Sequence, residues 1–228
     1  MIVIDIEASG TEWAKHSILS IGALDFEHPE NRFYEECRIW GVEDVRGTFS
    51  GFAQTICERC GAKCPASGQP QLRAHVMQGA LVVNGFTEAE ITDPSKKSEG
   101  EIARMFLEWS EHIADRTLAG QNVSFDRDFL RAACDRADLP WDIAHRTIDT
   151  HTLCYMHMVT HGITPPIDTQ HRRTALNLDA VLNYCGIPSE PEPHNALTGA
   201  LCHAEVISRL LYSIKLLPEF EQYPIPWL

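Results

Sequence analysis

The sequence predicts an α/β protein in which a mixed sheet is flanked by helices. Three observations predict it: a β-branched run at the N-terminus, two strand-like runs that follow it, and helical patterns that then alternate with short apolar strands. With 228 residues, of which 44% are hydrophobic, the chain is long enough to bury a full core. We therefore expect helices on both faces of one sheet.

The strands are concentrated at the start of the chain. Residues 2–6, 18–27 and about 32–40 have the apolar, β-branched composition of three strands. The His-Pro-Glu-Asn stretch at 28–31 predicts the turn between the last two.

Helices dominate the remainder, and their start and stop signals are local. The expected order is a helix opened by the capping box of Ser98 and Glu101, a strand at 116–120, a helix at 126–138 closed by Pro140, a helix after Asp149 and Thr150, a helix from Leu178 to Gly186, and a long helix at about 195–214.

Charge and composition limit the class of function. A formal net charge of −13 argues against a protein that coats long nucleic acid by neutralising phosphates. It is compatible with an enzyme that binds a few nucleotides through a metal. No apolar run is long enough to span a bilayer, and no export signal is recognisable. We therefore expect a cytoplasmic protein with no membrane partner, in which the eight cysteines stay reduced.

Two acids interrupt the first strand. Side chains alternate along a strand, so Asp5 and Glu7 point to one face while Ile4 and Ile6 point to the other. Two like charges on an apolar strand repel each other, so either one takes up a proton or a cation lies between them. A divalent metal with oxygen ligands, such as Mg²⁺, satisfies both carboxylates. The alternative is that the strand ends early and both acids are solvated.

Two further segments hold candidate catalytic residues, but neither indicates a function by itself. Asp126 stands at the start of a helix, where an acid also simply favours the helix dipole. His194 stands before the last helix, a position that caps and surface residues often occupy.

Together the three segments resemble the DEDDh superfamily of exonucleases, which includes the proofreading subunit of bacterial DNA polymerase III, ribonuclease T and oligoribonuclease. The matching segments are residues 5–10 with 18–23, a turn at 84–87, residues 120–130 with Gln121 where histidine is commoner, a helix at 175–187, and His194 with Ala196 and Ala200. The resemblance covers about residues 1–40 and 75–213.

The resemblance implies a ribonuclease-H-like fold and stepwise removal of nucleotides from the 3′ end of single-stranded or short RNA or DNA. It implies two Mg²⁺ or Mn²⁺ ions held by Asp5, Glu7 and Asp126, with His194 as the general base. Many relatives form homodimers. The substrate contacts implied or expected are Ala8, Ser9, Gly10, Phe86 and Asn122.

One position departs from the family pattern. The family's fourth carboxylate should stand at residue 199, where this chain has glycine. Glu205 lies nearly two helical turns further on and is too distant. Three interpretations stay open: a slower nuclease with water in the gap, an active enzyme with a ligand from elsewhere such as Asp149 or His203, or an inactive nucleic-acid binder.

A second departure is an apparent insertion at about 41–73. It holds Cys57, Cys60 and Cys64, and the close spacing of the first two suits a zinc knuckle whose fourth ligand would come from Cys37, His75 or another residue. The alternative, favoured by the missing second pair, is a loop with free cysteines. We expect this insertion to guide or restrict the substrate near the site.

We expect one exonuclease-like domain over residues 1–228, with that insertion and an extended, Pro-rich tail at 215–228 that docks through its aromatic side chains. The predicted function is a metal-dependent 3′-to-5′ exonuclease. The competing hypotheses are a catalytically impaired module of the same fold that binds nucleic acid or protein, and a metal-dependent hydrolase of a small phosphorylated molecule.

Overall fold

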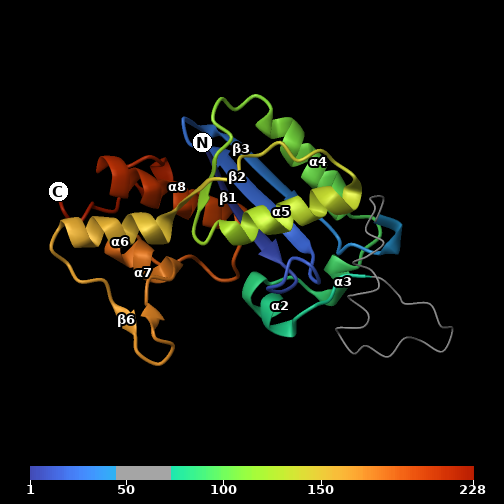
Figure 1. The fold of residues 1–228 in the computed structure, drawn as a ribbon, viewed down its shortest axis with the longest axis horizontal. Helices are drawn as coiled ribbons and strands as arrows, with labels where there is room; N and C mark the ends of the chain where they lie inside the picture. Colours follow the sequence, from blue (N-terminus) through green and yellow to red (C-terminus); the bar gives the residue numbers. More distant parts are fainter. Residues whose placement is uncertain (45–72) are drawn as a thin grey trace.

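The computed structural model describes residues 1–44 and 73–228 (Figure 1). The predicted insertion, including Cys57, Cys60 and Cys64, therefore lies almost wholly outside the described residues, and the zinc hypothesis stays untested.

The centre of the fold is a five-stranded sheet in the order β3-β2-β1-β4-β5. Its strands are β1 (Ile2–Ala8), β2 (Ile18–Asp25), β3 (His28–Glu36), β4 (Leu118–Gly120) and β5 (Thr147–Asp149). The central strand β1 pairs antiparallel with β2 and parallel with β4. The predicted mixed sheet is confirmed.

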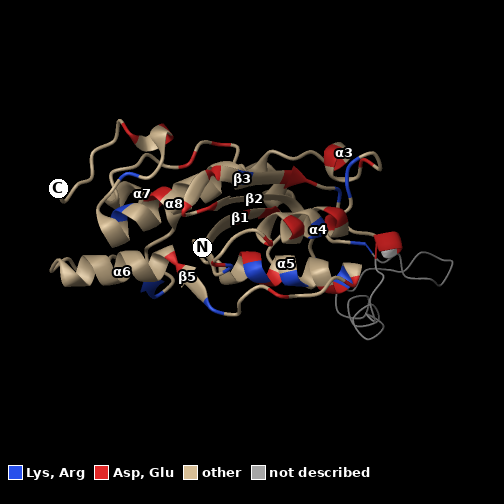
Figure 2. Ribbon diagram, turned by 90° about the horizontal axis from the view of Figure 1, so that it is seen from above, with Lys and Arg blue, Asp and Glu red and all other residues tan. Residues whose placement is uncertain are grey.

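Helices cover both faces of this sheet, as predicted (Figures 1 and 2). One face is packed against α4 (Glu99–Ser110) and α5 (Ser124–Ala137), and the other against α8 (Ala196–Tyr212).

The alternation along β1 assigns each of its side chains to a face. Ile2, Ile4 and Ile6 belong to the core shared with α4 and α5. Val3 belongs to the core on the α8 side. Asp5 and Glu7, two and four residues after Val3, therefore point toward the α8 side.

The remaining elements surround this framework. They are α2 (Gln78–Asn84), α3 (Glu88–Ile91), α6 (Thr150–Thr160), the hairpin of β6 (Ile167–Asp168) and β7 (Arg173–Thr174), α7 (Leu178–Tyr184), and the 3₁₀ turns η1 (Val42–Asp44) and η2 (Pro218–Phe220). In the described ranges, none of the helices is both long enough and apolar enough to cross a membrane.

The turn predicted at 28–31 was wrong. Strand β3 begins at His28, which pairs with Asp25, so the chain reverses at Phe26 and Glu27. Because β3 is the edge strand of the sheet, Pro29 can lie in it without costing a ladder hydrogen bond. The strand also ends at Glu36, short of residue 40.

The C-terminal tail docks on the body, as expected. The Trp227 ring centroid lies 4.3 Å from that of His157 on α6, and its indole N–H donates to Ser213 Oγ at 3.0 Å. Regular structure in the tail is limited to the 3₁₀ turn η2.

Candidate active site

Asp126 is placed beside Asp5 and Glu7 by the step from β4 into α5. Strand β4 is the parallel neighbour of β1, and α5 begins four residues after it ends, so Asp126 falls in the first turn of the helix. The side chain is only 2% exposed. The backbone of Ile6 lowers the pKa of both Asp126 and Asp5, so the two carboxylates lie near the same part of β1.

These acids resist ionisation because they lie close together and are partly or fully removed from water: Asp126 is buried, and Asp5 and Glu7 are half-buried. Burial raises the pKa of Asp5 well above its usual range, and the charges of Asp126, Glu7 and Glu190 raise it further. Burial and the charge of Glu190 raise the pKa of Glu7 to about 7, although His194 opposes this shift. The predicted trio thus forms one electrostatically coupled cluster.

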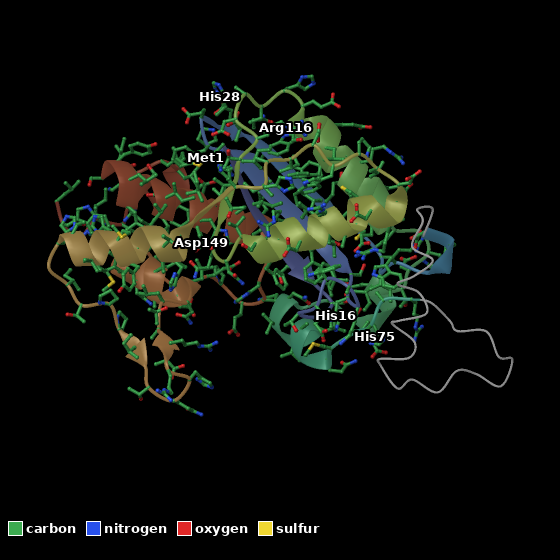
Figure 3. The ribbon with its side chains drawn as sticks, in the orientation of Figure 1. Met1, His16, His28, His75, Arg116 and Asp149 are labelled. Atoms are coloured by element: carbon green, nitrogen blue, oxygen red, sulfur yellow. The ribbon has the colours of Figure 1, made fainter. Side chains whose placement is uncertain are left out.

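The pKa of Asp126 is also raised well above its usual range, chiefly by burial. The backbone hydrogen bonds lower this pKa, whereas the charges of Glu7 and Asp149 raise it. Asp149 is the N-cap of α6, and its Oδ1 accepts the His151 N–H at 2.9 Å. Figure 3 shows Asp149 where β5 runs into α6, next to the start of α5.

His194 lies at the other side of the cluster, just before α8. Its backbone N–H donates to Val83 O at 3.0 Å, and Asn195 caps the helix by accepting from Leu197 N and Thr198 N. The His194 side chain is 37% exposed, and its Nδ1 lies 3.9 Å from Glu190 Oε2. The structure therefore brings the predicted base together with the predicted carboxylates.

Glu190 is the site residue that the sequence interpretation missed. It lies in the proline-rich segment before α8, and its side chain is only 4% exposed. An acid between prolines is usually solvated, so periodicity gave no reason to bury it. The available signal was its position four residues before His194.

Gly199 packs directly on Asp5. A Cβ atom at residue 199 would lie 2.3 Å from Asp5 Oδ2, so no side chain fits there while Asp5 keeps its conformation. His203, one of the predicted substitutes, is buried, with Nδ1 3.2 Å from the Ile4 carbonyl oxygen. Glu205 is paired with Arg209 at 2.7 Å. The other predicted substitute, Asp149, lies near Asp126, because its charge raises the pKa of the Asp126 carboxyl group.

The loop after β1 is held by its own hydrogen bonds. Ser9 Oγ donates to His75 O at 2.7 Å and accepts the Ser17 N–H at 2.9 Å, and the Ala8 carbonyl accepts from Asn84 Nδ2 at 3.2 Å. Gly10 packs so closely under His16 that a Cβ would lie 2.2 Å from its ring. These polar groups are committed to the fold, which fixes the backbone beside the carboxylates. Ala8, Ser9 and Gly10 can therefore contact a substrate, as predicted, only through backbone atoms that these hydrogen bonds leave free.

The two other predicted substrate residues differ in their surroundings. Phe86 is half-buried, packs against the cluster containing Leu81 and Ile91, and has Lys96 Nζ 5.1 Å from its ring centre. Asn122 is exposed and adopts a left-handed φ of 52°. Phe125, in the first turn of α5, packs against the core, with its ring centre 4.6 Å from that of Phe129.

Asn122 lines a polar cavity of about 750 Å³ at the carboxyl ends of β4 and β5. The cavity is also lined by Asp149, His151, Arg173 and Asn177. Gln121, which stands where the family pattern usually has histidine, accepts from the Thr150 hydroxyl and donates to Leu176 O. It therefore joins β4 to α6 at the wall of the cavity.

The carboxylates of this cluster are ligands that suit a hard divalent cation. Within residues 1–44 and 73–228, no three His, Cys, Asp or Glu side chains have the arrangement of a metal centre. In the same part of the chain, the largest charge effects on Asp5, Glu7 and Asp126 come from other carboxylates and from His194. Buried, oxygen-rich and acidic, this cluster has the chemistry that Mg²⁺ or Mn²⁺ prefers.

The order of the strands and the helices on both faces are those of a ribonuclease-H-like fold, as the sequence resemblance implied, and solved exonucleases share it. Among solved structures, E. coli exonuclease I in complex with a dA16 oligonucleotide matches with a TM-score of 0.58 and 15% identity, over 93% of this chain and 40% of that one. The zinc-bound exonuclease I–ssDNA complex matches at 0.60 and 15%, over the same shares.

Cell-death related nuclease 4 (CRN-4) matches with a TM-score of 0.61 and 11% identity, over 94% of this chain and 64% of that one. This chain thus spans about 40% of the length of exonuclease I. No protein-family model matches the chain, and no curated protein is significantly similar in sequence. At these identities the comparisons establish the fold.

Proposed function

We propose that this protein is a metal-dependent 3′-to-5′ exonuclease that removes nucleotides from single-stranded or short RNA or DNA. The observation that carries the proposal is the convergence of Asp5, Glu7 and Asp126 with His194 at one end of the sheet. The fold itself needs none of these acids in this place, because a buried Asp126 and half-buried Asp5 and Glu7 lie beside like charges at a cost in stability.

The carboxylates of Asp5, Glu7 and Asp126 would hold the metal ions. When bound, two divalent ions stabilise the entering and leaving oxygens of phosphodiester hydrolysis. His194 is the group that accepts the proton of the attacking water, because it is half-exposed and adjoins the acids.

The substrate class is supported by the neighbours of the fold and by local geometry. Exonuclease I has been solved with dA16 and with other oligonucleotides. In this chain, Asn122 and Arg173 line the 750 Å³ cavity, which Asp149 also lines, and would contact the strand. Phe86 would offer its ring to a base. The overall charge of −13 favours short substrates over long polyanions.

The test is degradation of 5′-labelled single-stranded RNA and DNA in Mg²⁺ and in Mn²⁺. We expect a ladder that shortens from the 3′ end, is abolished by Asp126→Asn and persists in Asp128→Asn. Asp128 is a matched control because it lies on the same helix and is partly exposed beside Arg127. Absence of cleavage in both metals would contradict the proposal, as would cleavage that survives Asp126→Asn.

A second candidate is a catalytically impaired module that binds 3′ ends, which Gly199 favours because the helix carries no acid at that position. Such a module would bind the labelled oligonucleotide equally well with and without a chelator and would not shorten it.

A further inference from the structure

Helix α8 carries no acid at residue 199, and the space there is taken up by Asp5. Gly199 lies so close to Asp5 that an added Cβ would be 2.3 Å from Oδ2 and 2.8 Å from Cγ of the carboxylate. A side chain at this position would therefore displace the Asp5 carboxylate from the place it occupies. An acid serving the same cluster has to come from another part of the chain.

Glu190 approaches the cluster from the segment before α8. Its Oε2 lies 3.9 Å from His194 Nδ1, and its Oε1 accepts the Asn195 N–H at 3.5 Å. Its charge raises the pKa of both Asp5 and Glu7. Together with Asp5 it also acts on buried Cys202 of α8, whose pKa is about 12 mainly because of burial. Glu190 is thus within electrostatic range of β1 and of α8.

The burial of Glu190 has no structural compensation of the usual kind. Three glutamates are buried in the described part of the chain: Glu99, Glu190 and Glu205. Glu99 is paired with Arg136 at 2.7 Å, and Glu205 with Arg209 at 2.7 Å. Glu190 has only the long contacts to His194 and Asn195. A buried carboxylate without a close cation is costly, and a bound divalent cation would remove that cost.

We propose that Glu190 supplies the fourth carboxylate of this site, in place of the acid that Gly199 excludes from α8. The inference rests on the proposed function, because it assumes that Asp5, Glu7 and Asp126 bind divalent metal. The segment that carries Glu190 is suited to the role: Pro191 and Pro193 restrict its backbone, and the His194 N–H anchors it to Val83 O.

The experiment measures Mn²⁺ binding by isothermal titration calorimetry on the full chain without nucleic acid. Glu190→Gln should weaken Mn²⁺ binding roughly 10- to 100-fold, the range found when groups that support a metal site are removed. Glu192→Gln, an exposed acid two residues away, should bind Mn²⁺ like the natural chain. Glu190→Asp, which keeps the charge but shortens the side chain, should give an intermediate affinity.

The remaining outcomes separate this inference from the proposed function. If Asp126→Asn loses Mn²⁺ binding while Glu190→Gln retains it, the role of Glu190 is refuted and the metal site stands. If Asp126→Asn also binds Mn²⁺ normally, the proposed function fails together with the inference. If Glu190→Gln keeps its Mn²⁺ affinity but changes the pH profile of cleavage, Glu190 acts as the partner of His194. If Glu192→Gln weakens Mn²⁺ binding as much as Glu190→Gln, the effect is one of general charge. Either outcome overturns the proposal.

Discussion

At the scale of single residues, the contact between Gly199 and Asp5 determines where a carboxylate of the proposed active site lies. The atom that a Cβ at residue 199 would meet is Oδ2, the far end of the Asp5 side chain. The side chain can rotate away from such a contact, so the main consequence of a substitution falls on the carboxylate and only weakly on the fold.

We therefore expect Gly199→Ala to keep its stability and lose its activity. Displacement of one reacting group by about 1 Å can cost roughly a hundredfold in rate. The measurements are the rate of 3′ shortening and the melting temperature. Gly79→Ala is the matched control, because no heavy atom lies within 4 Å of its added Cβ. Full activity in Gly199→Ala would show that the contact does not position Asp5.

His203 gives a prediction on pH. Burial lowers its pKa to about 4, although the hydrogen bond with the Ile4 carbonyl opposes the change, while an unfolded histidine has a pKa of about 6.5. Between these two pKa values the unfolded chain binds a proton that the folded chain does not. The contribution of His203 to the free energy of unfolding should therefore fall by roughly 2 to 4 kcal/mol as the pH drops from about 6.5 to about 4. The raised pKa of Glu7 acts in the opposite sense over the same range, so the prediction concerns the difference between variants.

Urea unfolding of the metal-free protein at about pH 7.5, 5.5 and 4.5 checks this prediction. His203→Gln should lose this contribution, so the variant should lose less stability than the natural chain between pH 7.5 and 4.5. His28→Gln, which changes an exposed histidine, should keep it. The same pH dependence in His203→Gln would assign the acid sensitivity to other groups.

At the scale of elements, the packing of α8 on β2 sets the position of the site. A Cβ at Gly22 would lie 2.1 Å from Ala196 C and 2.2 Å from Leu197 N, both backbone atoms in the first turn of α8. Backbone cannot rotate away as the Asp5 side chain can. The start of α8, and His194 just before it, is therefore held at a fixed height above the sheet.

Gly22→Ala should destabilise the protein by about 1 to 3 kcal/mol or more, the cost of overpacking a core. Gly79→Ala, the same change within helix α2 and in open space, should stabilise it by about 0.5 to 1 kcal/mol. Urea unfolding of both variants measures the difference. Equal stability of Gly22→Ala and the natural chain would contradict the close packing of β2 and α8.

At the scale of the whole molecule, one buried ion pair attaches the C-terminal tail. Glu205 accepts from Arg209 and from the backbone N–H groups of Leu216 and Leu217. Arg209 in turn donates to four carbonyls, those of Cys185, Phe220, Tyr223 and Pro224. The pair thus links α8, the end of α7 and the tail, which explains why Glu205 cannot serve the active site.

Arg209→Met should cost about 3 to 5 kcal/mol, because it leaves Glu205 buried without a cation. It should also release residues 216–228, whose backbone would exchange hydrogen for deuterium faster. Arg32→Met is the matched control: Arg32 pairs with Glu219 of the tail at 2.8 Å on the surface, so its loss should cost less than about 1 kcal/mol. Equal effects of the two changes would argue against the buried pair as the attachment.

Much of the fold could be predicted because its signals are local. The capping box of Ser98 and Glu101 opens α4 as expected, and the order of the main strands and helices was correct. The β6–β7 hairpin and α2 were missed because they are short and their patterns are weak. The start of β3 was misjudged because Pro29 reads as a turn residue unless the strand is known to lie at an edge.

Neighbouring residues in the sequence are sufficient to place Asp5 and Glu7 on one face, because strand alternation is a local property. The sequence is likewise sufficient to show that residue 199 carries no acid. Only the tertiary structure decided how close Gly199 comes to Asp5, and that Glu190 is buried beside the same carboxylates. Both depend on how α8 and the segment before it pack on β1, nearly 200 residues away along the chain, and no local pattern encodes a distance across the core.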